Sequence, residues 1–304
     1  YNFTLSGGGP GGLWSLVGGG INAAVVTAYP GSTITYQTSG GGFANVGVVS
    51  SGRAPLGLIH EVELKVAAAG GAPFKKPITN LRAIAYMYNW SPFQMVMTKA
   101  FSDKYGIRHM RDIASKKPPL RVIVNQRGHI ISQINRRLFA AHGVSFEDIK
   151  AWGGLVIFVG ARETGRMFSD RRIDMAANSG FLPYRYFLEV GKTQDLIMLP
   201  MGIDALRQVA ADTGAAPFPI PAGSYDWVKE EIQSIAIGAE LVASTHMSDA
   251  DAYALTKALV EGIDRIRGVH KAMRALTPQL MASQDAVPYH SGALRYYREA
   301  GLIK

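Results

Sequence analysis

The opening of the chain constrains its fold most, because a glycine-rich turn stands where a predicted strand passes into a predicted helix. A strand is expected over residues 1–5 and a helix over residues 13–27. The turn between them contains five glycines, in the order Ser6, Gly7, Gly8, Gly9, Pro10, Gly11, Gly12. Such a turn directs backbone N–H groups and the positive end of the helix at whatever binds there, which favours an anion.

Three interpretations of this turn stay open. Gly7, Gly9 and Gly12 match the G-x-G-x-x-G pattern of dinucleotide-binding folds, so an enzyme that uses a nucleotide cofactor is the alternative hypothesis. That site would need an acidic residue at the end of the second strand, expected over residues 33–38, but the first acidic residue of the chain is Glu61. A tight turn that needs glycine only for its backbone angles is the third interpretation.

A second glycine cluster follows the strand at residues 33–38 and again precedes a short helix, expected over residues 44–49. Two such turns at the carboxyl ends of successive strands fall where open α/β sheets place their ligands. Apart from Arg53, residues 1–60 carry no formal charge, so an anion bound here would rely on backbone and hydroxyl donors. The predicted contacts are Gly9, Pro10, Gly11, Gly12, Ser39, Gly40 and Gly41, with Trp14 as an apolar wall.

Strands and helices alternate along the rest of the chain, which predicts an α/β fold with mainly parallel sheets. Further strands are expected over residues 54–59, 81–88, 93–98, 120–124, 155–159, 172–177, 195–200 and 234–243. Residues 89–92 are expected to split the second strand of this series from the third, and residues 214–223, with three prolines, to form an irregular loop. Two lobes joined by crossing strands suit this order, with lobe I at 1–92 plus 235–304 and lobe II at 93–234.

Two helix ends carry clear signals. Gly143 follows a helix expected over residues 131–141, in the position where a left-handed residue often ends a helix. Ser248 is expected to cap a helix that starts at Asp249.

Composition excludes several classes of protein. The formal charge is +9, but the basic residues are scattered in pairs and no recognition-helix motif is present, so we expect no nucleic-acid partner. The absence of cysteine excludes thiol chemistry and disulfides. No apolar run reaches the roughly 20 residues of a membrane span. The chain opens without a basic and apolar leader, so we expect an exported protein whose signal peptide has been removed.

Catalytic patterns are missing as well. The chain contains no G-x-S-x-G elbow, no H-E-x-x-H and no P-loop, and its seven histidines lack paired metal-ligand spacing. We therefore expect a binding protein without cofactor or metal, and not an enzyme.

Several segments, taken in order, resemble the TAXI family, the solute receptors of TRAP-type transporters. The resemblance covers nearly the whole chain. Its parts are the opening glycine turn with Trp14, residues 38–41 followed by Asn45, and the segments 54–59, 81–85, 220–225 and 288–299.

This resemblance implies a two-lobed type II periplasmic-binding-protein fold, with the ligand in a cleft between the lobes. It also implies a periplasmic location and delivery of the ligand to a membrane permease driven by an ion gradient. Family members are associated with small carboxylates, so an organic carboxylate or an amino acid is the expected ligand.

The chain departs from the family pattern at three places. Gly9 and Pro10 stand where the family usually has hydroxyl residues, and His60-Glu61 replaces a segment that is often Gln-Ser-Asp. Small residues are usual after the strand at 120–124, but this chain has Asn125, Gln126, Arg127, Gly128 and His129. The family's usual ligand therefore does not carry over.

Arg127 is the leading candidate for binding a carboxylate, because a guanidinium can donate to both oxygens at once and the matching family position faces the cleft. The alternative is a surface arginine in a loop. Asn125 and Gly128 lie in the same turn, and His129 is a second donor or, alternatively, a structural residue at a helix start.

Two further groups complete the predicted site. His60 and Glu61 follow a buried strand and either bind an amine or hydroxyl of the ligand or simply begin a helix. Asn178, Ser179 and Gly180 follow another strand and offer amide, hydroxyl and backbone donors. Trp90 is an additional candidate for an apolar wall, and Tyr184 is a weaker one.

Overall fold

The computed structural model describes the whole chain, residues 1–304, and the chain divides into two compact units. Unit 1 consists of Tyr1–Asn89 and Gly238–Lys304, and unit 2 consists of Trp90–Ile237. These limits lie within a few residues of the predicted lobe boundaries. That the two units act as separately moving lobes stays a prediction.

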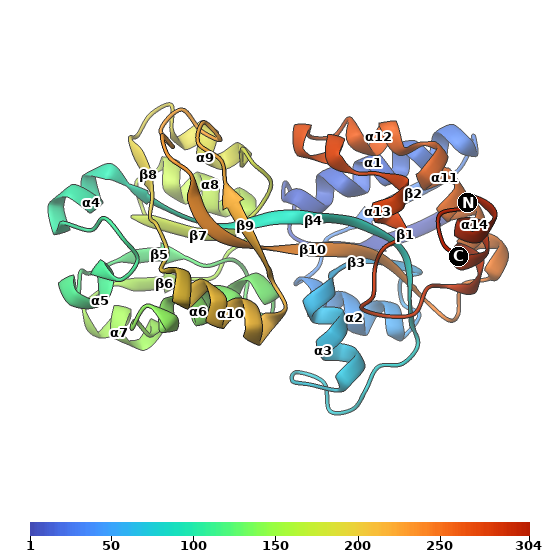
Figure 1. Ribbon diagram of the computed structural model, residues 1–304, viewed down its shortest axis with the longest axis horizontal. Coiled ribbons are helices and arrows are strands. Elements are labelled where there is room, and N and C mark those ends of the chain that lie inside the picture. The colour runs from blue at the N-terminus through green and yellow to red at the C-terminus, as the bar shows by residue number, and fades with distance from the viewer. The chain divides into compact units, whose positions relative to one another are not determined.

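Two long strands pass from one unit into the other. They are β4 (Leu81–Thr98) and β10 (Ile232–Ser244), and each changes unit in its middle (Figure 1). In unit 1, β10 pairs with β3. In unit 2, β4 pairs with β7 and β8, and β10 pairs with β9.

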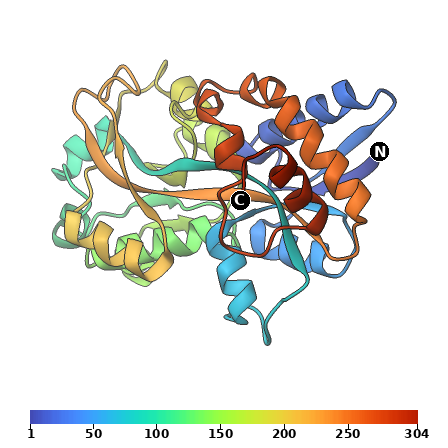
Figure 2. The ribbon, with the colours of Figure 1, turned by 45° about the vertical axis from the view of Figure 1, so that its right-hand side comes forward.

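Unit 1 is built on three parallel strands in the order β2-β1-β3, with β10 antiparallel to β3. The strands are β1 (Asn2–Ser6), β2 (Thr33–Gln37) and β3 (Leu56–His60). In Figures 1 and 2, α1 and α12 cover one face of this sheet, and α2 and α3 cover the other. The helices of the unit are α1 (Leu13–Ala28), α2 (Gly42–Ser50), α3 (Glu61–Ala69), α11 (Asp249–Glu261), α12 (Ile263–Arg267), α13 (Pro278–Met281), α14 (Ser291–Glu299) and a 3-10 turn at Lys271–Ala275.

Unit 2 repeats the scheme with the strand order β4-β7-β5-β6, in which β5 pairs in parallel with β6 and β7. Its strands besides β4 and β10 are β5 (Arg121–Ile123), β6 (Leu155–Ile157), β7 (Met175–Ser179), β8 (Leu196–Met198) and β9 (Ala216–Ile220). Its helices are α4 (Lys99–Tyr105), α5 (Asp112–Lys116), α6 (Ile130–Ala141), α7 (Phe146–Ala151), α8 (Ala161–Ser169), α9 (Arg185–Val190) and α10 (Ile203–Thr213). The α/β prediction is confirmed, with antiparallel crossing strands added to each parallel core.

Local sequence signals explain several of these elements. Ser248 caps α11 by accepting a hydrogen bond from Asp251 N at 3.0 Å, as predicted. Gly143 follows α6 with a φ of 77°, the left-handed conformation expected there. The longest helix, α1, has 16 residues, and no helix combines the length and apolar character that a membrane span requires.

Two secondary-structure predictions were wrong. Residues 89–92 do not split two strands, because β4 continues through them. Pro92 lacks an N–H, but its carbonyl still accepts a hydrogen bond from Gly180 N, so the strand tolerates it. The loop expected at residues 214–223 contains β9, an edge strand with prolines at 217 and 219. These prolines are two residues apart, so their nitrogens lie on the same side of the strand, and an edge strand tolerates missing N–H groups on its unpaired side.

In each unit a buried asparagine links the end of one strand to the neighbouring strand. In unit 1, Asn45 of α2 donates from Nδ2 to the carbonyls of Gly7, at 3.0 Å, and Leu58, at 2.7 Å. In unit 2, Asn135 of α6 donates to the carbonyls at residues 124 and 177, at 3.4 and 2.7 Å. Both side chains are fully buried, and each satisfies carbonyls where a strand leaves the sheet.

Asn45→Ala should lower the free energy of unfolding by roughly 1–3 kcal/mol, because it leaves buried polar groups without partners. Asn135→Ala should lower the free energy of unfolding by less. The Oδ1 of Asn45 also accepts hydrogen bonds from Ser6 and Ser39, whereas the Oδ1 of Asn135 has no partner. Urea unfolding of both variants measures the difference, with exposed Asn2→Ala as the control. Equal stability of Asn45→Ala and wild type would contradict this role.

Glu240 is an acidic residue buried in the core of unit 1. It lies on β10 opposite Ile59, is 1% exposed, and its Oε2 has no hydrogen-bond partner. Burial raises the pKa of the Glu240 carboxyl well above its ordinary value, and the negative charge of Glu61 raises it further. The folded chain therefore holds this proton more tightly than the unfolded chain does.

Glu240→Gln should make unit 1 more stable at alkaline pH and leave stability nearly unchanged at about pH 4. A carboxyl whose pKa is raised by folding contributes full stability below its unfolded pKa, and this contribution is lost as pH rises toward the folded pKa. Melting temperatures of wild type and variant across pH measure the effect, with exposed Glu261→Gln as the control. A constant difference between wild type and Glu240→Gln at every pH would contradict the assignment.

Candidate ligand site

The first glycine turn of unit 1 joins β1 to α1 and is partly held by its own amides. Gly7 N donates to the carbonyl of Gln37 at 2.9 Å, and Gly8 N donates to the Tyr36 hydroxyl at 2.7 Å. A Cβ at Gly7 would lie 2.2 Å from the Tyr36 ring, so only glycine fits there. Gly12 caps α1 without a capping side chain, and the first turn of α1 contains no acidic residue. The structural interpretation therefore holds for Gly7 and Gly8, while the positive end of α1 has no acidic side chain of its own.

The other predicted residues of this turn lie in different environments. Gly9 is half-buried and Pro10 is exposed. Trp14 is 4% exposed, and its Nε1 donates to the Tyr88 hydroxyl at 2.8 Å. Its ring centroid lies 4.7 Å from that of His60, so Trp14 and His60 pack against each other within unit 1.

The second glycine turn is organised by Ser39. Its hydroxyl donates to Asn45 Oδ1 at 2.6 Å and accepts from Gly41 N at 3.1 Å. Gly41 has a φ of 115°, which favours glycine, and it caps α2. Gly40 is exposed. The contact of these three residues with a ligand stays a prediction.

The start of α2 already has an anion beside it, which sequence reasoning missed. A Cβ at Gly42 would lie 1.5 Å from Glu63 Oε2, so the carboxylate of Glu63 packs directly against the first residue of α2. Glu63 is fully buried, and the same oxygen lies 3.2 Å from both the N and the Nδ1 of His60. The positive end of α2 thus stabilises a carboxylate of the protein itself.

The strand extends one residue further than predicted, so His60 is the last residue of β3 and Glu61 is the first residue of α3. His60 caps α3 in a reciprocal capping box with Glu63. Glu61 is half-buried, accepts a hydrogen bond from the Tyr86 hydroxyl, and accepts from Gly238 N at 3.4 Å. Burial and the charge of Glu61 raise the pKa of Tyr86, so this hydroxyl stays protonated and donates a hydrogen bond to Glu61. The helix-start interpretation is correct for this pair, and a further role in ligand binding stays a prediction.

Arg127 lies in unit 2 in the turn between β5 and α6, and its side chain is exposed. Its guanidinium carbon sits 4.0 Å above the ring centroid of Phe158, and the guanidinium makes no ion pair. The Phe158 ring is itself in edge contact with Phe146. The cation is therefore held in place by stacking, while its N–H groups are not used by any carboxylate of the protein.

The neighbours of Arg127 shape the turn. Asn125 and Gly128 both have a φ of 74°. His129 caps α6, with its Nδ1 accepting from Ile131 N at 3.4 Å. Gly160, at the start of α8, caps that helix without a side chain. The turn between β5 and α6 therefore places the exposed guanidinium of Arg127 close to the start of α6.

Asn125 and Asn178 come together at the carboxyl ends of the adjacent parallel strands β5 and β7, where Asn125 follows β5 and Asn178, predicted to follow its strand, lies within β7. Asn125 Nδ2 donates to Asn178 Oδ1 at 2.8 Å, and the same oxygen accepts from Ser179 N at 2.9 Å. Asn178 Nδ2 donates to the Tyr184 hydroxyl at 3.1 Å. Asn178 is buried, and both the oxygen and the nitrogen of its side-chain amide are hydrogen-bonded. Asn125 is only half-buried, so it is the more exposed of the two.

A relay of hydrogen bonds extends this pair into unit 2, and sequence reasoning missed its inner members. Tyr184 N donates to the Tyr225 hydroxyl at 2.7 Å, which donates to Gln94 Oε1 at 2.5 Å. Gln94 Nε2 then donates to the carbonyl of Gly180 at 2.9 Å. The relay fixes the turn after β7 through residues from β4 and from the segment before β10. No spacing along the chain signals it, because its members are separated by up to 131 residues.

Two other predicted residues are placed as follows. Ser179 is buried and donates to the carbonyl of Ser91 at 2.7 Å. Trp90 stacks with Phe181 at a centroid distance of 6.5 Å. The Trp90 Nε1 is buried and has no hydrogen-bond partner, which is unusual for a buried donor.

Solved structures share this fold over nearly the whole chain. MatC from Rhodopseudomonas palustris with bound malate is 14% identical, with 99% of this chain and 97% of that chain covered and a TM-score of 0.62. The periplasmic binding protein BugD is 13% identical, with 99% and 98% covered and a TM-score of 0.62. An R. palustris protein with adipate is 13% identical, with 99% and 96% covered and a TM-score of 0.55. The chain thus has the α/β fold of periplasmic binding proteins, as predicted.

Family membership follows from the sequence itself, in which one family model matches almost from end to end. The resemblance expected above agrees with this in fold and in the general type of protein. The chain belongs to the NMT1-like family, whose match spans residues 5–301.

Proposed function

We propose that this chain is the periplasmic solute receptor of a TRAP-type transporter of the TAXI subtype. It captures a small molecule with a carboxylate group and delivers it to a membrane permease. On this proposal it catalyses no reaction and reaches the periplasm after removal of a signal peptide. Membership of the NMT1-like family and a fold shared with periplasmic binding proteins support this type of protein.

The proposed ligand class rests on the surroundings of the Arg127 guanidinium. A guanidinium stacked on Phe158 without a carboxylate partner is preorganised to receive an anion from outside the chain. Its planar fork matches the two oxygens of a carboxylate. Two of the solved structures that share the fold, MatC with malate and the R. palustris protein with adipate, are named with small dicarboxylates, and this supports the same ligand class.

Unit 1 supports a second feature of the ligand. Glu61 begins α3, is half-buried, and forms no ion pair with a lysine or arginine. We propose that Glu61 accepts a hydrogen bond from an amine or hydroxyl of the ligand. A hydroxy acid or an amino acid therefore fits better than a plain fatty acid.

A thermal-shift screen should find stabilisation by small hydroxy, dicarboxylic or amino acids and none by NAD or ATP. A ligand that binds only the folded chain raises stability by RT ln(1 + [L]/Kd), so a ligand at about a hundred times Kd adds roughly 2.7 kcal/mol. A flat response to all acids, together with stabilisation by a nucleotide, would replace this proposal with the cofactor-dependent enzyme.

Arg127→Ala should weaken binding of the acid found in that screen by roughly 2–5 kcal/mol, because the ligand anion loses its charged partner. Arg127→Lys should restore only part of this, since an ammonium has neither the two-donor fork nor the same stacking on Phe158. Stability without ligand should change by less than about 1 kcal/mol. Isothermal titration of the three proteins measures the affinities.

Arg136→Ala is the matched control. Arg136 also stacks on a phenylalanine, with its guanidinium carbon 4.7 Å from the Phe146 centroid, but it pairs with Glu147 on the protein surface. Its loss should leave ligand affinity unchanged. Wild-type affinity in Arg127→Ala would show that Arg127 is only a surface arginine.

A further inference from the structure

Two side-chain amides at the carboxyl ends of β5 and β7 have orientations that the backbone fixes. Gln126 N donates to Asn125 Oδ1 at 2.6 Å. Ser179 N donates to Asn178 Oδ1 at 2.9 Å. A backbone N–H can only donate, so both of these side-chain atoms are oxygens and the other atom of each amide is a donor. The Nδ2 of Asn125 donates to Asn178 Oδ1 at 2.8 Å, and the Nδ2 of Asn178 donates to the Tyr184 hydroxyl at 3.1 Å.

This order of donors and acceptors leaves the proton of the Tyr184 hydroxyl unused. An amide nitrogen accepts no hydrogen bond, so the Tyr184 oxygen accepts from Asn178 and its own O–H points elsewhere. The hydroxyl forms no other hydrogen bond within the chain. By contrast, the buried hydroxyls of Tyr225 and Tyr297 each donate to an oxygen of the chain, at 2.5 and 2.8 Å.

The ring of Tyr184 is held in place, so the position of the hydroxyl is fixed as well. Tyr184 N donates to the Tyr225 hydroxyl at 2.7 Å, and the ring centroid lies 5.1 Å from that of Phe187. A Cβ at Gly180 would lie 2.6 Å from Tyr184 Cδ2, so the ring lies directly against the turn after β7. Burial raises the pKa of the Tyr184 hydroxyl, which therefore stays protonated. The group is a preorganised donor beside Asn178.

A second unused donor borders the same turn. Trp90 stacks with Phe181, the residue after Gly180, and its Nε1 is buried without a partner. Buried donors without an acceptor are rare in native proteins, because their desolvation is not compensated. Two of them beside one turn indicate that the turn after β7 meets acceptor atoms from outside the chain.

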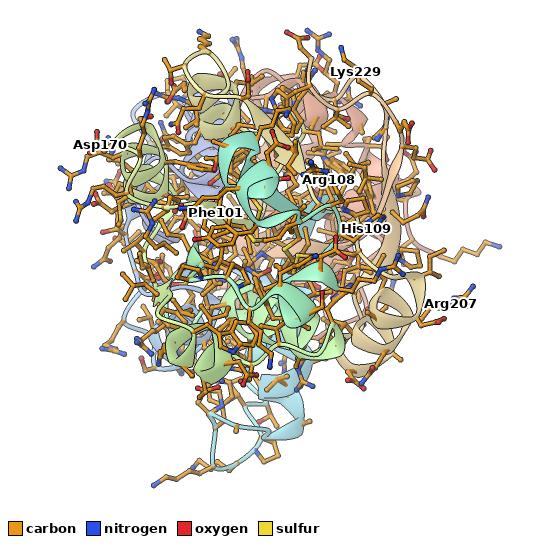
Figure 3. All side chains as sticks on the ribbon, turned by 90° about the vertical axis from the view of Figure 1, so that its left-hand side faces the viewer. Phe101, Arg108, His109, Asp170, Arg207 and Lys229 are labelled. Atoms are coloured by element: carbon orange, nitrogen blue, oxygen red, sulfur yellow. The ribbon has the colours of Figure 1, made fainter.

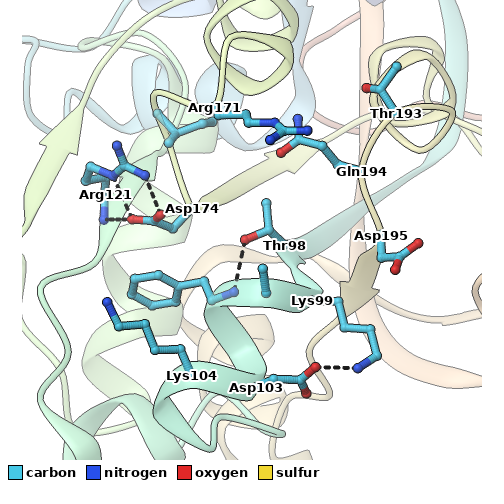
Figure 4. Close-up of a pocket in the computed structure, with 13 residues that line it drawn as sticks. Thr98, Lys99, Asp103, Lys104, Arg121, Arg171, Asp174, Thr193, Gln194 and Asp195 are labelled. Atoms are coloured by element: carbon cyan, nitrogen blue, oxygen red, sulfur yellow. Dashed lines mark hydrogen bonds and ion pairs between the residues drawn. The ribbon is translucent and has the colours of Figure 1, made fainter.

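The opposite end of these strands differs, because its charged side chains are paired with one another or exposed to solvent. A pocket of about 630 Å³ lies there, in which Arg121 donates to Asp174 (Figure 4). Figure 3 shows Phe101 of α4 on this side of unit 2. The ring centroid of Tyr105, in the same helix, lies 4.7 Å from that of Phe101. Tyr105 is therefore a tyrosine of unit 2 that lies away from Asn178, and it serves as a control.

We propose that the Tyr184 hydroxyl donates a hydrogen bond to an oxygen of the bound ligand, an inference that rests on the receptor function proposed above. Since the protein supplies the proton, the ligand atom must be an acceptor, such as an oxygen of a carboxylate, hydroxyl or carbonyl group. An ammonium group has no lone pair and cannot take this position. Tyr184 thus selects acids by the acceptor that they present, in addition to the charge that Arg127 receives.

Titration calorimetry with malate and adipate compares wild type, Tyr184→Phe and Tyr105→Phe. Tyr184→Phe should bind at least about fivefold more weakly than wild type, because the ligand oxygen loses its donor. Tyr105→Phe removes a tyrosine hydroxyl at the other end of the strands and should bind like wild type. Melting temperatures above the temperature of the titration show that both variants are folded.

A second replacement separates binding of the ligand from support of Asn178, because Tyr184→Phe also removes the acceptor of Asn178 Nδ2. Incorporation of 3-fluorotyrosine in place of Tyr184 keeps the hydroxyl, and the fluorine makes it a stronger donor and a weaker acceptor. This protein should bind the acids more tightly than wild type if the O–H donates to the ligand. A hydroxyl that only accepts from Asn178 gives no such gain.

The inference is overturned if Tyr184→Phe binds like wild type, if Tyr105→Phe loses as much affinity, or if the protein with 3-fluorotyrosine binds no more tightly than wild type. Weaker binding by Arg127→Ala together with wild-type affinity in Tyr184→Phe removes this inference and leaves the receptor function standing. If wild type binds neither acid, the proposed dicarboxylate class and this inference fail together.

Discussion

The arrangement of both units depends on how carbonyl groups are satisfied where parallel strands end. A strand that leaves the sheet for a turn loses its ladder partner, and a buried carbonyl without a partner is costly. Asn45 and Asn135 solve this in the same way, each with one amide nitrogen between a carbonyl just past a strand end and a carbonyl of the neighbouring strand. Because these amides come from helices, they also fix each helix against the sheet. The turns that follow can then be used for binding without holding the fold together.

The turns at the carboxyl ends of the parallel strands carry side chains of opposite charge in the two units. In unit 1 the start of α2 receives the buried carboxylate of Glu63, and Glu61 begins α3 beside it. In unit 2 the corresponding edge carries the exposed guanidinium of Arg127 with no carboxylate to neutralise it.

Much of the architecture could be predicted from periodicity and turn residues. The strand, glycine turn and helix at residues 2–28, the cap at Ser248 and the end of α6 at Gly143 are local features, so local sequence predicts them. The continuity of β4 through Pro92 and the strand β9 could not be predicted in this way. In both, proline removes a donor that no neighbour requires, and only the paired strand shows that.

The sequence by itself determined the α/β class and the positions of the polar turns, because each depends on neighbouring residues and on composition. Only the tertiary structure decided which contacts the residues of those turns make. His60 and His129 are helix caps, Glu63 occupies the start of α2, and Asn178 is held by a relay that ends at Gln94. These roles depend on contacts between residues far apart in the chain, whose distances no local pattern records.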